Sequence, residues 1–150
     1  MFAILEAGNQ IAANALLFEE FLTRAQKAGR LDLPLNPVRK KALLHGHCHQ
    51  KAFGAMGAVE FALRLVPELE VETVDSSCCG MAGAFGYDAA TIDVSLAMGE
   101  LSLLPAVRKA DEHTIVVADG TSCRHQIHDG ASREAVHVAR VLEMSLTQGA

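Results

Sequence analysis

The sequence predicts an α/β domain: a short parallel sheet built from three strand–cysteine loop–helix units, flanked by helices, with an extra N-terminal helix. Two observations predict this class. Short apolar or β-rich runs alternate with stretches of helical character, which is typical of βαβ units and a parallel sheet. The chain has 150 residues, half of them hydrophobic, which suits one domain with its own core.

The predicted elements follow in a regular order. Apolar residues at helical spacing over residues 3–28 end at Gly29, which predicts a helix with a glycine stop. The two prolines of "GRLDLPLNPVRK" indicate a loop. Three strand runs then lead to cysteines: "KALLHGHC", "LEVETVDSSCCG" and "HTIVVADGTSC". The helices expected after them cover residues 51–67, 87–112 with a break near Pro105, and 133–147.

Charge and hydropathy exclude several function classes. The net charge of −5 does not favour a nucleic-acid partner, which would require a basic surface. The first residues lack the pattern of a signal peptide. Direct membrane insertion is not expected, because no stretch approaches the ~20 apolar residues that span a bilayer. We therefore expect a cytoplasmic protein that is peripheral to a membrane only through its partners.

All four cysteines lie just after a predicted strand: Cys48 after the first, Cys78 and Cys79 after the second, and Cys123 after the third. In open α/β sheets, ligands bind beyond the carboxyl ends of the strands. The four thiols should therefore meet at one edge of the sheet. Stable disulfides are the weakest interpretation, because a reducing cytosol favours metal binding or catalysis by cysteine clusters.

The stretch "SSCCGMAGAFGY" contains two adjacent cysteines, Cys78 and Cys79. Neighbouring side chains on a strand point to opposite faces, so both can serve one ligand only in a loop. Gly80, Gly83 and Gly86 supply such a backbone, and their N–H groups could face an anionic cluster. A glycine-rich turn with two buried cysteines is the alternative.

The other two cysteine stretches are less specific. In "HGHCHQKA", alternation along a strand would put His45, His47 and His49 on one face and Cys48 on the other. We therefore expect Cys48 to be a ligand and the histidines, His47 foremost, to support it. Cys123 follows a candidate N-cap, and a helix N-terminus favours the metal-binding thiolate. Arg124 could add positive charge beside an anionic cluster or point to solvent.

Four thiolates at one edge could bind zinc or an iron–sulfur cluster. Zinc sites usually use cysteines two to four residues apart, whereas these cysteines are widely spread apart from one adjacent pair. Glycine N–H donors to sulfur suit a cluster. A zinc-binding structural or interaction module and a metal-free thiol redox protein remain the alternatives.

Together, and in this order, "HGHCHQK", "CCGMAGAFGY" and "DGTSCRHQ" resemble the cysteine-rich CCG domain of Fe–S oxidoreductases. That family includes the heterodisulfide reductase B subunit and the iron–sulfur subunits of glycolate, lactate and glycerol-3-phosphate oxidising enzymes. The closest resemblance is to the C-terminal part of FAD-linked D-2-hydroxyacid dehydrogenases of the lactate and glycolate type. It spans residues 40–128, and "ANALLFEEFL" is similar to the linker between two such repeats.

The resemblance implies iron–sulfur-dependent electron transfer within an FAD-linked 2-hydroxyacid oxidoreductase. It implies Cys48, Cys78, Cys79 and Cys123 as ligands. From their places in the three stretches, we expect Gly80, His47 and Arg124 beside the cofactor, and we assign no catalytic residue. One departure is Gln126, which stands where heterodisulfide-reductase-type sites have a fifth cysteine; a four-cysteine [4Fe-4S] cluster fits better.

A second departure concerns the missing parts. The chain contains no first repeat, no flavin domain and no ferredoxin-like cysteine run. We therefore expect residues 1–39 to be the tail of a preceding repeat, with an exposed apolar face, and residues 40–150 to be the CCG-type domain. FAD would lie on a missing domain or partner subunit, and a ferredoxin-like Fe–S domain would be another partner. Alone, the chain should not complete a dehydrogenase reaction.

Overall fold

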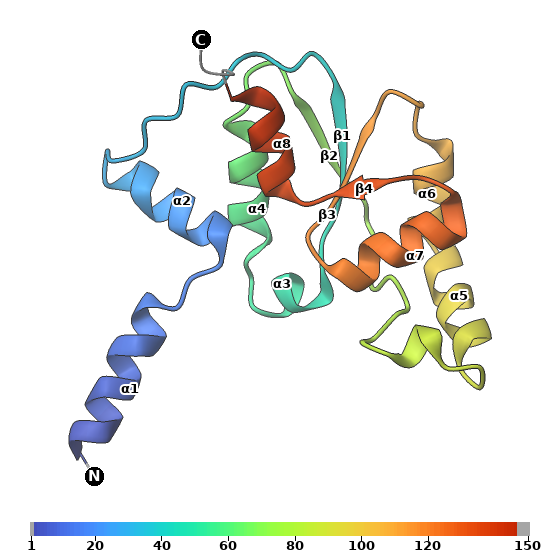
Figure 1. Ribbon diagram of the computed structural model, residues 1–150, viewed down its shortest axis with the longest axis horizontal. Helices are drawn as coiled ribbons and strands as arrows, with labels where there is room; N and C mark the ends of the chain where they lie inside the picture. Colours follow the sequence, from blue (N-terminus) through green and yellow to red (C-terminus); the bar gives the residue numbers. More distant parts are fainter. Residues whose placement is uncertain (1, 147–150) are drawn as a thin grey trace.

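The computed structural model describes residues 2–146, with side chains from residue 6 onward. The fold is α/β, with a four-stranded parallel sheet flanked by helices and preceded by an N-terminal helix, as the sequence predicts (Figure 1). The strands are β1 (Lys41–His45), β2 (Glu70–Thr73), β3 (Ile115–Ala118) and β4 (Ala135–Val136). The helices are α1 (Phe2–Asn14), α2 (Phe18–Lys27), α3 (Cys48–Ala52), α4 (Met56–Arg64), α5 (Ile92–Glu100), α6 (Leu103–Lys109), α7 (Thr121–Ala131) and α8 (Val138–Ser145), with a 3-10 turn, η1 (Phe85–Tyr87).

The strand order is β2-β1-β3-β4, and every neighbouring pair is parallel. β1 is central: Leu43 pairs with Glu72 of β2 on one side and with Val116 of β3 on the other. The chain passes from β1 outward to β2 and later returns to the opposite side of β1 as β3. This reversal of strand order places a topological switch point between the carboxyl ends of β1 and β3, where open α/β sheets bind ligands.

Each face of the sheet has its own hydrophobic core. On one face, Leu44 of β1 and Val117 of β3 belong to a buried cluster with residues of α4 and α8. On the other face, Leu43 and Val116 belong to a cluster with residues of α6 and α7. The alternation of side chains along β1 and β3 explains this division, because successive residues of a strand point to opposite faces. Figure 1 shows the helices in layers on both sides.

Three predicted helices are interrupted. The helix expected over residues 3–28 is two helices, α1 and α2, and the one over 51–67 is α3 and α4, separated near Gly54 with φ of 69°. The break in the third comes at residues 101–102, before Pro105, which is the third residue of α6. Proline is tolerated in a first helical turn because its missing N–H needs no partner there.

In the C-terminal part, the sequence predicts a helix that starts near Cys123 but not its full extent, and it does not predict a fourth strand. The helix begins as expected, but its N-cap is Gly120 rather than Thr121 or Ser122. Residues 121–131 form the complete helix α7, and the stretch expected as one helix from residue 133 begins with the short strand β4. β4 pairs with β3, with Val116 opposite Ala135. A two-residue strand carries too little alternating pattern to be recognised, so only pairing with β3 defines it.

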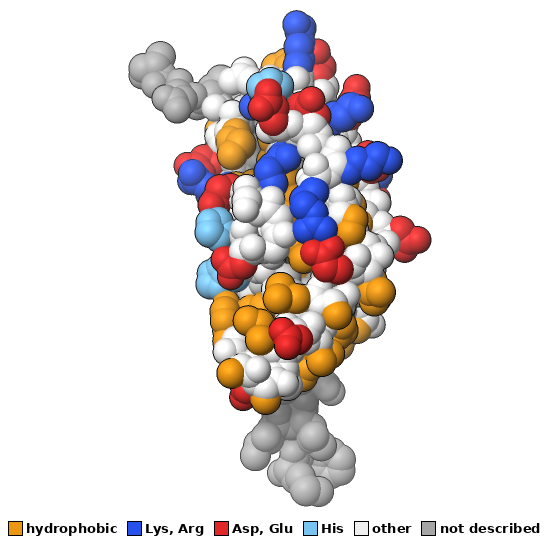
Figure 2. All heavy atoms as spheres, turned by 90° about the vertical axis from the view of Figure 1, so that its right-hand side faces the viewer, with side chains coloured by type: hydrophobic (Ala, Val, Ile, Leu, Met, Phe, Trp, Pro, Cys, Tyr) orange, Lys and Arg blue, Asp and Glu red, His pale blue; other side chains and the backbone are white. Residues whose placement is uncertain are grey.

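Most of the exposed large apolar side chains lie in two regions. Around α1 and α2 these are Ile11, Leu17, Phe18 and Phe21, where the sequence predicts an exposed apolar face. Around α5 they are Tyr87, Ile92, Val94, Leu96 and Leu101. Figure 2 shows hydrophobic side chains gathered at the lower end of the face that carries α5, with charged side chains mostly above them. Within residues 2–146, none of the helices combines the length and apolar character needed to span a bilayer.

Candidate metal centre

Three segments that follow strands meet at the carboxyl edge of the sheet. His45 is the last residue of β1 and pairs with Ala118, the last residue of β3. Cys123 is the third residue of α7, which is separated from the end of β3 by two residues. Cys79 lies in the segment between β2 and η1, residues 74–84, here called the double-cysteine loop. The chain order therefore brings residues far apart in sequence to the switch point.

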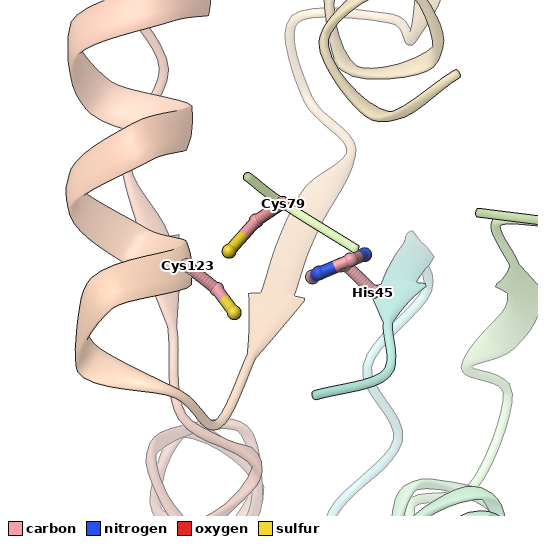
Figure 3. A group of neighbouring side chains, drawn as sticks. All are labelled: His45, Cys79 and Cys123. Atoms are coloured by element: carbon pink, nitrogen blue, oxygen red, sulfur yellow. The ribbon is translucent and has the colours of Figure 1, made fainter. Parts of the chain in front are cut away.

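His45, Cys79 and Cys123 form a buried group, here called the buried trio. One ligand atom from each residue lies within 4.8 Å of the other two. The three side chains point into a common space (Figure 3). All four cysteines are free thiols, with Cys79 and Cys123 buried, Cys78 half-buried and Cys48 exposed.

Cys79 and Cys123 have opposite acid–base behaviour. The pKa of Cys79 is lowered, first because Cys123 donates a hydrogen bond to it and further because His45 and the backbone N–H of Met81 favour the thiolate. The pKa of Cys123 is raised by the same interaction with Cys79 and by burial. The pair thus shares one proton, and a thiolate is the form of cysteine that binds metal.

Cys48 and Cys78 lie at the rim of the buried trio. Cys78 Sγ accepts a hydrogen bond from the Gly80 N–H at 3.3 Å, while burial raises the pKa of its thiol. Cys48 begins α3, three residues after the end of β1, and Cys78 follows the end of β2 in the double-cysteine loop. The four predicted ligands are therefore gathered at one edge of the sheet, although only two of them belong to the buried trio.

Gly80 is required by the backbone of the double-cysteine loop. Its φ of 95° is rarely adopted by residues with a side chain, and a Cβ there would lie 2.1 Å from the carbonyl oxygen of Ser95 in α5. The loop therefore packs directly on the α5 backbone. This close approach leaves the Gly80 N–H directed at the sulfur of Cys78.

The histidines near Cys48 do not alternate along a strand, contrary to the sequence-based expectation, because β1 ends at His45. His47 is the N-cap of α3, and its Nδ1 accepts a hydrogen bond from the His49 N–H at 3.3 Å. A Cβ on Gly120 would lie 2.3 Å from His47 Cδ2 and 3.0 Å from Cys123 Sγ. His47 therefore packs beside the turn that leads to Cys123. Its pKa is lowered, first by burial and then by His49.

Arg124 binds the backbone of the turn between β3 and α7. Its guanidinium donates hydrogen bonds to the carbonyl oxygens of Ala118 at 3.0 Å and Asp119 at 2.7 Å, and to Thr121 Oγ1 at 3.2 Å. It does not simply point to solvent, and it holds the turn that carries Cys123. Whether it also acts on a cofactor stays a prediction.

Gln126 occupies a buried position one turn after Cys123. Its Nε2 donates hydrogen bonds to the main-chain oxygen of Ser95 at 3.1 Å and to Ser95 Oγ at 3.2 Å. The side chain thus links α7 to α5. At the position where a fifth cysteine would offer a thiol, Gln126 instead packs and hydrogen-bonds between α5 and α7, the two helices that flank the centre.

His45 and Lys51 lie at this edge but are not among the site residues that the sequence predicts. In the sequence His45 is only one of three neighbouring histidines, and no motif assigns Lys51 a role. Lys51 donates hydrogen bonds to the main-chain oxygens of Ser76 and Ser77, which precede Cys78. The signal for His45 is present in "KALLH", where a histidine ends an otherwise apolar strand, but its partners come from other segments.

A second polar group lies next to the centre. Glu19, Asp119 and His137 each offer a ligand atom within 4.8 Å of the others. The Asp119 carboxylate already accepts hydrogen bonds from Gln50 Nε2 at 2.7 Å and the Val138 N–H at 2.9 Å. Asp119 therefore links the start of α8 to the middle of α3. The group lines a groove of about 1010 Å³ that shares His47 and Gly120 with the cysteine edge.

No protein-family model matches the chain, and no solved structure matches it. Curated proteins do. The chain is 33% identical over 116 residues to a subunit of the anaerobic glycerol-3-phosphate dehydrogenase of Escherichia coli (strain K12). It is 38% identical over 116 residues to the D-2-hydroxyglutarate dehydrogenase of the same organism, and 34% identical over 58 residues to the protein of that name from Pantoea ananatis.

The two longer alignments cover 76% of this chain, but only 28% of the first relative and 11% of the second. The chain thus spans about a quarter or less of the proteins it matches. Both relatives are dehydrogenases or part of one by name, which supports an oxidoreductase-associated role.

Proposed function

We propose that the chain is an iron–sulfur-dependent electron-transfer domain or subunit of an FAD-linked 2-hydroxyacid oxidoreductase. The observation that carries this proposal is the gathering of all four cysteines, from three separate segments, at the carboxyl edge of one parallel sheet. The relatives support it, because one is named a 2-hydroxyacid dehydrogenase and the other is named as part of a dehydrogenase.

The residues fit a thiolate-bound metal centre. His45 belongs to the buried trio, and its Nε2 is a buried nitrogen without a hydrogen-bond partner among the described residues. Cys78 receives a backbone N–H, and Cys123 lies in the first turn of α7, where the helix dipole favours negative charge. Cys48, Cys78, Cys79 and Cys123 would hold the centre, which we propose to be a [4Fe-4S] cluster. Such a cluster supplies one-electron transfer.

The surroundings indicate what the chain itself contributes. Cys79 and Cys123 are buried and so shielded from water, whereas Cys48 is exposed at the rim. Hydrogen bonds to the cysteine sulfurs tune the potential of a cluster. The Gly80 N–H on Cys78 would serve this purpose, and the Lys51 and Arg124 side chains hold the two turns that carry Cys78 and Cys123.

The chemistry requires partners. Oxidation of a 2-hydroxyacid to a 2-oxoacid releases two electrons and two protons, and we propose that FAD on another domain or subunit accepts them. This chain, with a ferredoxin-like Fe–S domain, would then pass the electrons singly to a downstream acceptor. Exposed apolar side chains around α2 and α5 support protein partners, since exposed apolar patches commonly mark interaction sites. We place the protein in the cytoplasm on the basis of its free thiols.

The test is the metal content of the full chain purified without oxygen. About four iron and four sulfide per chain, with brown colour, are expected for a [4Fe-4S] centre. Cys79→Ser and Cys123→Ser should lose this iron, whereas the control Ser77→Ala, next to Cys78, should retain it. Iron content unchanged by both cysteine variants would remove the basis of the proposal. Zinc without sulfide would indicate a structural zinc module instead.

A further inference from the structure

His45 is a buried histidine with an unusual hydrogen-bonding deficit. Its exposed fraction is 1%, and it ends the central strand β1. Nδ1 lies 2.9 Å from Ser76 Oγ, but Nε2 has no hydrogen-bond partner among the described residues. A buried polar atom left unpaired costs about 1–3 kcal/mol, so such an atom needs a physical explanation.

The surroundings of His45 supply a candidate explanation. In the buried trio, the donor atoms of His45, Cys79 and Cys123 all lie within 4.8 Å of one another (Figure 3). For metal–ligand bonds of about 2.0–2.3 Å, donor atoms around one tetrahedral metal lie roughly 3.5–3.8 Å apart. The trio is therefore spaced so that small movements would bring all three atoms onto one metal atom.

The other ring nitrogen of His45 has the partner that a metal-bound histidine needs. Ligating histidines almost always donate their second ring N–H to an oxygen, which fixes the tautomer and the ring orientation. Ser76 Oγ lies next to Nδ1, and the Lys51 ammonium, which can only donate, lies 3.4 Å from the same oxygen. Ser76 Oγ can accept from both groups, which leaves the lone pair of Nε2 for a metal.

We propose that His45 is a nitrogen ligand, through Nε2, of the metal centre that Cys79 and Cys123 also bind. The proposal rests on the presence of a metal centre at this edge, but it holds for either an iron–sulfur or a zinc centre. Histidine in place of cysteine raises the potential of an iron–sulfur centre, as in Rieske sites. In a mononuclear zinc centre the three donors would share one metal atom. In a [4Fe-4S] cluster each iron takes one protein ligand, so His45 would hold one iron in place of one of the rim cysteines, Cys48 or Cys78.

The experiment uses the full chain, purified anaerobically with histidine labelled with ¹⁵N at both imidazole nitrogens. Pulsed EPR of the reduced centre should show a nitrogen hyperfine coupling that changes between ¹⁴N and ¹⁵N samples. The coupling should disappear in His45→Gln and persist in His49→Gln, the matched control, because His49 is exposed and outside the trio. Identical spectra from the ¹⁴N and ¹⁵N wild-type samples would overturn the proposal without needing any variant.

A second variant covers the case in which His45→Gln does not fold. His45→Cys offers a sulfur donor instead, and its centre should have a lower reduction potential than the wild type. An isotope-sensitive nitrogen coupling that persists in a folded His45 variant would contradict the assignment.

Iron, sulfide and zinc measured on the same samples separate this inference from the proposed function. If zinc replaces iron, the electron-transfer proposal fails. Zinc-edge X-ray absorption should then still show a nitrogen scatterer near 2.0–2.1 Å that is lost in His45→Gln. Only sulfur scatterers would overturn the ligand assignment as well. A chain that binds no metal after reconstitution with iron and sulfide would overturn both proposals.

Discussion

Gly80 packs directly against the main-chain carbonyl of Ser95, so that a Cβ at this glycine would lie 2.1 Å from the carbonyl oxygen. The contact joins the double-cysteine loop to α5, and the oxygen belongs to helix backbone that cannot move aside without disturbing α5. Gly80 also has a φ of 95°, which a side chain disfavours. The positive φ and the close contact with Ser95 therefore each require glycine at position 80, next to Cys79.

Gly80→Ala should destabilise the protein by about 2–4 kcal/mol, because backbone strain and a steric clash add together. The matched control is Gly83→Ala in the same loop, where φ is 70° but no atom lies within 4 Å of the position that a Cβ would occupy. That variant should lose only about 1–2 kcal/mol. Urea unfolding followed by circular dichroism measures both values. Equal losses would show that the contact with Ser95 has no energetic role.

Gln126→Met should cost about 1–3 kcal/mol, because it removes the amide that donates to the Ser95 oxygens while nearly conserving volume. Gln126→Ala should cost more, about 2–4 kcal/mol, because it also leaves a cavity between α5 and α7. Chemical denaturation of the two variants separates the hydrogen-bond contribution from the packing contribution. A neutral Gln126→Met would mean that the link to Ser95 does not stabilise the fold.

Glu19 should make folding stability depend on pH. Burial raises the pKa of its carboxyl, Asp119 raises it further, and the residue's own backbone N–H and His137 oppose the shift. The folded state therefore holds this proton more tightly than the unfolded state, whose carboxyl titrates near 4.5. Stability from the protonated form is complete below that value and is lost as pH rises through the higher folded pKa.

The neutral variant Glu19→Gln removes this titration. Its stability relative to the wild type should rise as pH increases from about 4 to 7, the range above the unfolded carboxyl pKa. Urea titrations across this range measure the difference. The control Glu72→Gln neutralises an exposed carboxylate on edge strand β2. A Glu19→Gln advantage that is constant with pH, or that grows on acidification, would contradict the prediction.

Removal of metal should leave the domain folded. One of the two hydrophobic cores, which includes Leu44, Leu63 and Val117, contains no cysteine, so it does not depend on a metal. Chelation should retain the far-ultraviolet circular dichroism and increase hydrogen exchange mainly in residues 74–84 and around Cys48. Thermal unfolding should move to lower temperature, because a ligand that binds only the folded state stabilises it. Collapse of the whole domain on chelation would be the opposite result.

The fold class can be predicted from the sequence because it depends on local patterns. Apolar runs such as "KALLH" and "TIVVA" each alternate with a helical stretch, and short-range periodicity is enough to identify them. The helix breaks are harder to locate. The break before α6 falls at residues 101–102 rather than at Pro105, because a first helical turn accommodates proline. β4 exists only through its pairing with β3.

The sequence by itself determined the positions of the four cysteines relative to the strands, and hence their common edge, because parallel strands all end on the same side of a sheet. Only the tertiary structure decided which groups meet there. His45 joins Cys79 and Cys123, while Gln126 turns to Ser95 and Arg124 to the β3–α7 turn. These choices depend on packing between segments far apart in the chain, as for His45 and Ser76, which are separated by 31 positions. No local pattern encodes such contacts.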